Sequence, residues 1–356
     1  MHYRKHIIFL VSIIYATCNS TYGQLAESFP DSIILKQRQL RILFYNVENY
    51  FDTVNDSLKN DDDFLPDRGK YWTKSRYYTK QKHISQVIVA VGGWRPPEII
   101  GLCEIENHTV LTDLVNYAPI KNLNYRIIHK ESPDKRGIDV ALLYQKKHFI
   151  PISYKPIEIN YPFSAGSTTR DILYVKGKTK QNDTLHIFVN HWPSRWGGQL
   201  ETERKRMFVA SILKNETDSI FKTNEQANIV IMGDFNDYPE NKSLSISLDA
   251  KKEFNNILPE KLYNMGAYLQ NVKGVGTHKH EGKWATLDQF IISGSLLLAK
   301  NKIYTSVNDV HAYNTSFLLE PDNNYSGFTT KRTYIGFRYH GGYSDHLPTF
   351  LDLHKK

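Results

Sequence analysis

Polar side chains that could bind a metal ion or move a proton adjoin the ends of apolar segments at five places in this sequence. The apolar run Ile229–Met232 leads to Asp234 and Asn236, which point the same way on extended backbone because they are two residues apart. The other four endings are Asn46 with Glu48, Glu104, Asn190 with His191, and Asp345 with His346. Each ending alone is also typical of a turn or a cap. Five together predict a cleft lined with carboxylates, amides and histidines.

The predicted cleft is rich in oxygen ligands, which favours a hard cation. We expect Mg²⁺, with Mn²⁺ or Ca²⁺ as alternatives, because a Zn²⁺ site would need His and Cys clusters that the sequence does not contain. Carboxylates, a divalent cation and histidines together are typical of phosphate ester hydrolysis. In that reaction the metal offsets charge on the phosphoryl and leaving oxygens, and a general base deprotonates water.

These residues need a framework of strands and helices to bring them together. Strands are predicted at Arg41–Tyr45, Glu98–Cys103, Tyr125–His129, Asp139–Tyr144, Asp171–Val175, Leu185–Val189, Ile229–Met232, Thr286–Ile292 and Thr349–Leu353. Helices are predicted at Lys74–Val91, Thr109–Tyr117, Gly198–Phe221 and Glu240–Ser247. This order indicates an α/β protein with mixed sheets covered by helices, not a regular βαβ repeat.

The length and composition are those of a soluble globular protein. The 356 residues suffice for one large α/β domain or two smaller ones, and no low-complexity linker or internal repeat divides the chain. We therefore expect a single domain over residues 40–356. The 45 Lys and Arg exceed the 37 Asp and Glu by 8, and removal of Arg4 and Lys5 with a leader would leave an excess of 6. This charge favours polyanionic partners such as nucleic acid.

Residues 1–23 have the pattern of a secretory signal peptide. A basic start at Arg4 and Lys5 precedes an apolar run too short to span a membrane, and small residues follow. Cleavage after Gly23 would leave residues 24–39 as an N-terminal extension of a secreted or periplasmic protein, without stable membrane insertion. Acylation of Cys18 in a lipoprotein is the weaker alternative. Cys103 would then be the only cysteine, and we expect it to be buried.

Seven short motifs resemble those of the endonuclease/exonuclease/phosphatase superfamily, in the same order. They are FYNVEN, GLCEIEN, RGIDVALLY, NHWPSR, GDFND, LDQFIIS and SDHLP. The superfamily includes pancreatic deoxyribonuclease, exonuclease III, neutral sphingomyelinases and inositol polyphosphate 5-phosphatases. The resemblance extends from about Leu40 to the C-terminus. It implies a deoxyribonuclease-I-like fold: a four-layered α/β sandwich of two mixed β-sheets face to face, flanked by helices, with the active site at one edge.

The resemblance also implies roles for individual residues. Glu104 would be the principal metal ligand, with Asn46, Glu48 and Asp345 as further ligands. The catalytic residues it implies are His191, Asp234, Asn236, Asp288 and His346.

Within that catalytic set, Asp234 would orient or deprotonate the attacking water, and Asn236 would hold a phosphate oxygen. His346 would act as general base or as phosphate stabiliser, supported by the carboxylate of Asp288. Gln289 is a departure, because relatives commonly have tyrosine there.

Four residues near these motifs could contact substrate. Trp192, Arg195 and Trp196 could form a platform that stacks a base and binds a phosphate, although core or rim packing of the tryptophans is the alternative. Arg170 could reach a phosphate or form a surface ion pair.

The combined prediction is a secreted, divalent-metal-dependent phosphodiesterase, first of all a nuclease acting on DNA or other nucleic acid. One alternative is a phosphoesterase of the same fold that acts on phospholipid head groups or inositol phosphates. A second is a catalytically inactive binding module. The sequence does not distinguish endonuclease from exonuclease action, and we expect a monomer.

Overall fold

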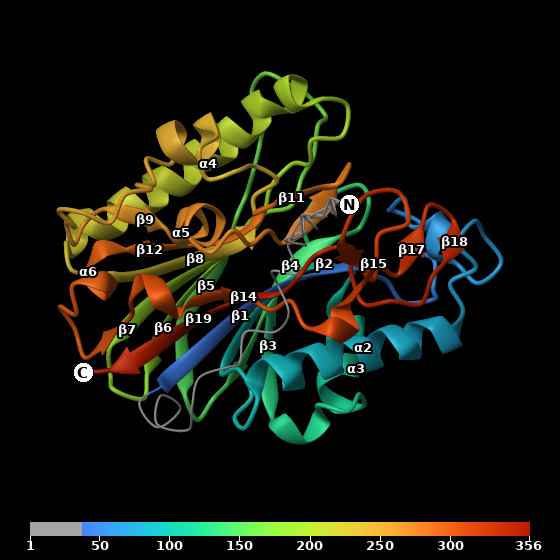
Figure 1. Ribbon diagram of the computed structural model, residues 1–356, viewed down its shortest axis with the longest axis horizontal. Coiled ribbons are helices and arrows are strands. Elements are labelled where there is room, and N and C mark those ends of the chain that lie inside the picture. The colour runs from blue at the N-terminus through green and yellow to red at the C-terminus, as the bar shows by residue number, and fades with distance from the viewer. Residues whose placement is uncertain (1–37) are drawn as a thin grey trace, which may run out of the picture.

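The computed structural model describes residues 38–356 and shows four layers, with two β-sheets face to face and helices on both outer faces (Figure 1). The predicted signal peptide and nearly all of the predicted extension lie outside the described residues. The four-layered α/β sandwich is confirmed.

The first sheet has the order β13-β19-β1-β2-β4-β3, and β14 also pairs with β19. Only β1 and β2 run parallel in it, so the sheet is mixed. Its strands are β1 (Arg38–Tyr50), β2 (Ile99–Ile105), β3 (Tyr125–His129), β4 (Asp139–Gln145), β13 (Ile303–Tyr304), β14 (Val310–Ala312) and β19 (Thr349–Lys355).

The second sheet has the order β5-β6-β7-β8-β12-β9. It is also mixed, because β7 and β8 are parallel and the other pairs are antiparallel. Its strands are β5 (Phe149–Ile157), β6 (Ile172–Thr179), β7 (Thr184–His191), β8 (Asn228–Asp234), β9 (Leu262–Asn264) and β12 (Asp288–Ser293). The two sheets thus each contain one parallel pair.

Helices cover the outer face of each sheet. On the first sheet lie α2 (Lys74–Gly92) and α3 (His108–Asn116), and on the second lies α4 (Gln199–Thr223) (Figure 1). The shorter helical elements are Asp62–Phe64, Lys121–Leu123, the π-helical turn Ser243–Ser247, α5 (Met265–Asn271), α6 (Gly294–Leu297), Val307–Asp309 and Ser316–Leu318. None of the helices within residues 38–356 has the length and apolar character needed to span a bilayer.

Three small hairpins lie outside the two large sheets. They are β10 (His278–His280) with β11 (Lys283–Ala285), β15 (Leu319–Pro321) with β16 (Phe328–Thr330), and β17 (Tyr334–Ile335) with β18 (Arg338–Tyr339).

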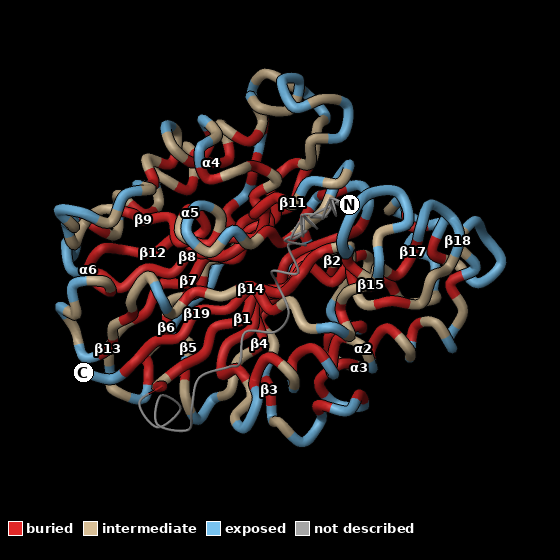
Figure 2. The backbone as a smooth tube through the Cα atoms, viewed as in Figure 1, coloured by how far each residue is buried: buried red, intermediate tan, exposed pale blue. Residues whose placement is uncertain are grey.

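The core follows the two-residue alternation of the strands. Along β1, Ile42 and Phe44 face the opposite sheet, whereas Leu43 and Tyr45 belong to the cluster beneath α2 and α3. Figure 2 shows the strands of both sheets as the buried centre of the molecule. Cys103 is fully buried between the sheets, which confirms the prediction for this thiol.

Every strand predicted from the sequence has a counterpart, and the bounds differ by a few residues. The short strands and the edge strand β5 were missed, and β5 is hard to recognise because it contains Pro151 and Pro156 and exposes much of its length. The predicted helix Glu240–Ser247 is only a π-helical turn, which begins at Ser243.

Candidate active site

The parallel pair of the first sheet places two of the predicted metal ligands at one edge. β1 and β2 end at the same edge, because parallel strands share their direction. Asn46 on β1 is opposite Cys103, so Glu104 follows immediately beside it. Asn49 donates its backbone N–H to Glu104 Oε2 at 2.8 Å. The sheet therefore brings Asn46 and Glu104 together, as predicted.

The second sheet groups three predicted catalytic residues around one position. His191 at the end of β7 is opposite Asp234 at the end of β8, and Asp288 at the start of β12 is opposite Asp234 on its other side. All three are buried. Asn46 Nδ2 donates to Asp234 Oδ2 at 3.1 Å, and this hydrogen bond joins the two sheets at the site.

His346 comes from the segment before β19 and faces the same group. Its Nδ1 lies 2.7 Å from Asp288 Oδ2, and its Nε2 lies 3.8 Å from Asp234 Oδ2. Burial opposes a charge on this imidazole, but the carboxylates of Asp288 and Asp234 outweigh it and raise the pKa of His346 well above its ordinary value. Burial also raises the pKa of Asp234 to about 7, although the charge of His346 opposes that shift.

His191 lies between a predicted metal ligand and a predicted catalytic carboxylate. Its Nε2 lies 3.7 Å from Asp234 Oδ2 and 3.9 Å from Glu104 Oε1. Burial and the nearby Arg170 lower the pKa of His191 well below its ordinary value, which keeps the imidazole neutral.

Arg332 is a site residue that the sequence analysis missed. Its Nε donates to Glu48 Oε1 at 3.2 Å, and its Nη2 donates to Asp345 Oδ2 at 2.9 Å. The backbone N–H of Thr333 also donates to Glu48, at 2.6 Å. Although burial opposes the charge, His346 and Arg332 lower the pKa of Asp345 to about 2. Arg332 lies between β16 and β17, where no pattern in the sequence marked it.

The predicted metal ligands have the chemistry of a hard-cation site. Glu48, Glu104 and Asp345 all interact electrostatically with Arg332 and with the buried Lys80, so three carboxylates lie around two positive groups. Carboxylate and amide oxygens suit Mg²⁺, and the donor set fits such an ion. Asn46 is hydrogen-bonded at both ends of its amide, because its Oδ1 accepts from the backbone N–H of Glu48 at 3.0 Å. The roles of Asn46, Glu48, Glu104 and Asp345 as metal ligands remain predictions.

Three site residues adopt a backbone conformation that is uncommon for non-glycine residues. The φ angles of Glu48, Glu104 and Asn236 are 51°, 61° and 52°. Such left-handed positions concentrate at functional sites, where the surrounding structure holds them. Asn236 is held by a hydrogen bond from its N–H to Asp234 Oδ1 at 2.9 Å and one from its Nδ2 to the backbone oxygen of Trp192 at 3.0 Å.

The two tryptophans of the predicted aromatic platform differ in their exposure. Trp192 is 1% exposed, packs edge-on against Phe235, and donates its indole N–H to Asn190, so it cannot stack on a base. Its substrate-binding role was a wrong prediction, and core packing is the correct alternative. Trp196 is 90% exposed and remains available.

The two predicted phosphate-binding arginines are engaged with the protein. Arg195 donates to the backbone oxygen of Asn236 at 2.7 Å and to Asp237 at 3.0 Å, which braces the loop after β8. Arg170 is buried and donates to Asp134 at 3.1 Å and to the backbone oxygen of Trp192. It is a buried pair and not the surface pair considered from the sequence. Contact of either arginine with substrate stays a prediction.

Gln289, at which the sequence departs from the family pattern, is hydrogen-bonded within the protein. It is fully buried, accepts from Asn264 Nδ2 at 2.7 Å, and donates to the backbone oxygens of Asp237 and Thr286. The neighbouring Asp288 keeps its place in the site.

A cleft of about 960 Å³ opens beside the candidate active site. Asp345 and Arg332 line the end nearest the site, and Trp196 lies on the wall formed by the loop before α4. The further cationic residues of the lining are Lys135, Arg136, Arg170 and Lys205. The cleft is therefore predominantly basic.

The family profile described as "Endonuclease/Exonuclease/phosphatase family" matches residues 41–355. This chain belongs to that family. As a member of the endonuclease/exonuclease/phosphatase family, the protein is a phosphoester hydrolase of the metal-dependent type. No curated protein sequence matches the chain closely enough to count as a relative.

Solved structures with the same fold have low sequence identity to this family member. The catalytic domain of human Nocturnin with bound sulfate is 16% identical with a TM-score of 0.53, and the match covers 89% of this chain and 94% of that one. TDP2 from D. rerio with a single-strand DNA product is 13% identical with a TM-score of 0.53, covering 88% and 98%. A family protein from Bacteroides thetaiotaomicron is 13% identical with a TM-score of 0.54, covering 88% and 94%. At these identities the likeness concerns the fold.

Proposed function

We propose that this enzyme is a nuclease that hydrolyses phosphodiester bonds of DNA or another nucleic acid. The observation that carries the proposal is the basic cleft, which adjoins the candidate active site through Asp345 and Arg332. A polyanion that enters this cleft would present a phosphate to Asp234 and His346. TDP2, which has a similar fold, has been solved with a single-strand DNA product, and this supports the same class of substrate.

The charges of the cleft suit a chain of several phosphates better than a single head group. Arg136 has a side chain that is 49% exposed, and its ion-pair partner Asp134, at 3.5 Å, is shared with Arg170. Lys205 is bonded to the neutral Ser167, so its charge is not cancelled by that contact. Phosphate contacts of this kind supply most of the sequence-independent affinity for nucleic acids. The exposed ring of Trp196 could stack on a base at the rim of the cleft.

The residues of the site suit the attack of water on a phosphate. Asp288 fixes the orientation of His346 by bonding to Nδ1, which leaves Nε2 toward Asp234. Asp234, held by Asn46, would orient the attacking water, and Asp234 or His346 would take its proton. Asn236 would hold a phosphate oxygen. A Mg²⁺ ion held by Glu48, Glu104 and Asp345 would offset the charge of the phosphoryl and leaving oxygens.

Parallel assays on three substrate classes test this proposal. Plasmid and oligonucleotide DNA, sphingomyelin, and inositol polyphosphates would each be incubated with the enzyme and Mg²⁺, or with EDTA. We expect cleavage of nucleic acid that EDTA abolishes. Release from lipid or inositol phosphate without cleavage of DNA and RNA would contradict the proposal and favour the other phosphoesterase class.

A charge reversal in the cleft connects the activity with this surface. Arg136→Glu should weaken binding of an oligonucleotide and lower the slope of log affinity against log salt by about 1. Lys147→Glu is the matched control, because Lys147 is exposed and follows the end of β4 that lies away from the site. Equal effects of the two substitutions would show that the cleft does not bind the substrate.

A further inference from the structure

Two histidines that are far apart in the sequence lie together beside the candidate active site. His278 begins β10, and His346 precedes β19. An antiparallel β-bridge joins His278 with His346, and the backbone N–H of Leu347 donates to the backbone oxygen of Thr277 at 2.7 Å. The backbone therefore holds the two imidazoles side by side.

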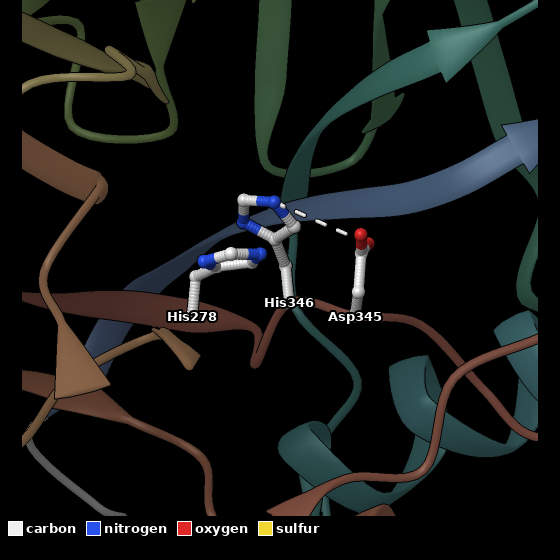
Figure 3. Close-up of side chains that lie close together, drawn as sticks. All are labelled: His278, Asp345 and His346. Atoms are coloured by element: carbon white, nitrogen blue, oxygen red, sulfur yellow. Dashed lines mark ion pairs between the residues drawn. The ribbon is translucent and has the colours of Figure 1, made fainter. Parts of the chain in front are cut away.

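Figure 3 shows how these rings lie with respect to Asp345. The ring centroids of His278 and His346 are 4.6 Å apart with an angle of 39° between the planes. Nε2 of His346 lies 4.0 Å from Asp345 Oδ1. One ligand atom from each of the three residues lies within 4.8 Å of the others. Small side-chain movements would bring all three onto one ion.

We propose that His278, Asp345 and His346 form a second metal site, selective for Zn²⁺ or a similar transition-metal ion, whose occupation inhibits the enzyme. The inhibition rests on the proposed function, whereas the binding does not. Two imidazole nitrogens with one carboxylate are a ligand set for Zn²⁺ that leaves a position open for water. Mg²⁺ prefers oxygen ligands, so the oxygen-rich group around Glu104 and the histidine pair should select different ions.

The surroundings of His346 match those of a metal-binding histidine. Ligating histidines usually bond through their other ring nitrogen to a carboxylate, which fixes the ring. Asp288 bonds to Nδ1 of His346 in this way at 2.7 Å and leaves Nε2 toward Asp345.

Zinc at this position would block the proposed reaction in two ways. The ion would occupy Nε2 of His346, the atom that faces Asp234 and the water to be activated. It would also engage Asp345, one of the predicted ligands of the catalytic ion. Bound Zn²⁺ would then stop hydrolysis even in the presence of excess Mg²⁺.

No local pattern in the sequence marks this site. His278 and His346 are 346 − 278 = 68 residues apart, and no short spacing typical of zinc ligands links them. Because a local His and Cys cluster is missing, the sequence analysis favours Mg²⁺ over Zn²⁺. The fold supplies the cluster instead, by bridging β10 to the segment before β19.

The test measures Zn²⁺ binding directly, in full-length protein without a polyhistidine tag and with excess Mg²⁺. Isothermal titration calorimetry would compare wild type with His278→Phe, which keeps an aromatic ring against His346 and removes the ligand nitrogens. His280→Phe is the matched control on the same hairpin, because the His280 side chain is 79% exposed. Removal of an outer-shell partner of a metal ligand costs roughly 10–100-fold in metal affinity, so removal of the proposed ligand in His278→Phe should lower Zn²⁺ affinity by at least that factor. His280→Phe should bind Zn²⁺ like wild type.

Inhibition of Mg²⁺-supported hydrolysis by Zn²⁺ should shift by the same factor in His278→Phe. Equal Zn²⁺ binding by wild type and His278→Phe would overturn the site. Absence of binding by wild type that hydrolyses its substrate would overturn it as well. Zinc binding that depends on His278 in a protein without hydrolytic activity would leave the site standing and reject the proposed function. The visible spectrum of the Co²⁺-loaded wild type should show nitrogen ligation without any variant, and its absence would also count against the site.

Discussion

His346 and Asp288 are joined by a hydrogen bond of 2.7 Å between Nδ1 and Oδ2, and both side chains are buried. This pair confirms the placement of the LDQF segment beside the SDH segment in one cleft. Thr277 joins the two segments by accepting a hydrogen bond from each. Its Oγ1 accepts from the backbone N–H of Asp288 at 3.1 Å, and its backbone oxygen accepts from that of Leu347 at 2.7 Å.

The first prediction concerns the pH dependence of hydrolysis in Asp288→Asn. Burial opposes the charge on His346 and Asp288 supports it, so removal of Asp288 should lower the pKa of His346. If neutral His346 is the general base, the rate rises with pH through this pKa. If cationic His346 stabilises the phosphate, the rate falls instead. In both cases the pH at which the rate changes should be lower in Asp288→Asn than in wild type. Rate profiles at saturating metal would show this, and an unchanged pH would assign the rate change to another group.

The second prediction concerns the metal ligand Glu104. Glu104→Gln removes one charge but keeps the shape and an oxygen that can accept from the N–H of Asn49. We expect hydrolysis to fall by orders of magnitude, Mg²⁺ affinity to fall with it, and the melting temperature of the metal-free protein to stay unchanged. Glu253→Gln, at an exposed position, is the control. Nearly normal activity of Glu104→Gln at saturating Mg²⁺ would exclude Glu104 as principal ligand.

The third prediction separates the two neighbouring tryptophans. Trp192→Ala should lower the free energy of unfolding by about 3–5 kcal/mol, because Trp192 is buried. Trp196→Ala should leave stability unchanged and weaken oligonucleotide binding by about 1–3 kcal/mol if its ring stacks on a base. Trp94→Ala is the control, because Trp94 is 92% exposed and lies beyond the end of α2. Urea titrations and binding titrations on the three variants would decide. Equal binding by Trp94→Ala and Trp196→Ala would remove the stacking role.

The fourth prediction concerns export, which the segment 1–23 indicates. Mass spectrometry of protein from the native host should find the mature N-terminus at Gln24. A mature chain that begins with a lipid-modified Cys18 would support the lipoprotein alternative. Recovery of an intact chain from Met1 in the cytoplasm would contradict export.

The fifth prediction concerns stability in acid. Burial lowers the pKa of His186 to about 4, and the phenol of Tyr174 lies 2.7 Å from its Nδ1. Because the unfolded chain binds this proton near pH 6.5, stability should fall as the pH drops from about 6.5 to 4, by up to about 3 kcal/mol. His186→Gln should lose this part of the pH dependence, which urea midpoints at several pH values would measure. An identical slope in the variant would assign the loss to other groups.

The sequence predicted the parts of the site that depend on local pattern. Apolar runs that end in Asp234 or Glu104 are visible without a structure, because strand direction fixes where their polar ends lie. Arg332 and His278 were missed because their roles depend on loops and hairpins that meet only in the folded chain. Trp192 was misjudged for a related reason, since a ring beside a catalytic residue can point inward or outward.

The hydrogen bond between Asn46 and Asp234 crosses from one sheet to the other, and the sheets meet closely beneath it. A Cβ atom on Gly101 of β2 would lie 2.6 Å from Cε of Met232 on β8. The separation of the reactive groups is therefore set by the thickness of the apolar layer between the sheets. A change of side-chain volume in that layer should therefore change the spacing of the two sheets at the site, so we expect residues that never touch substrate to affect the rate.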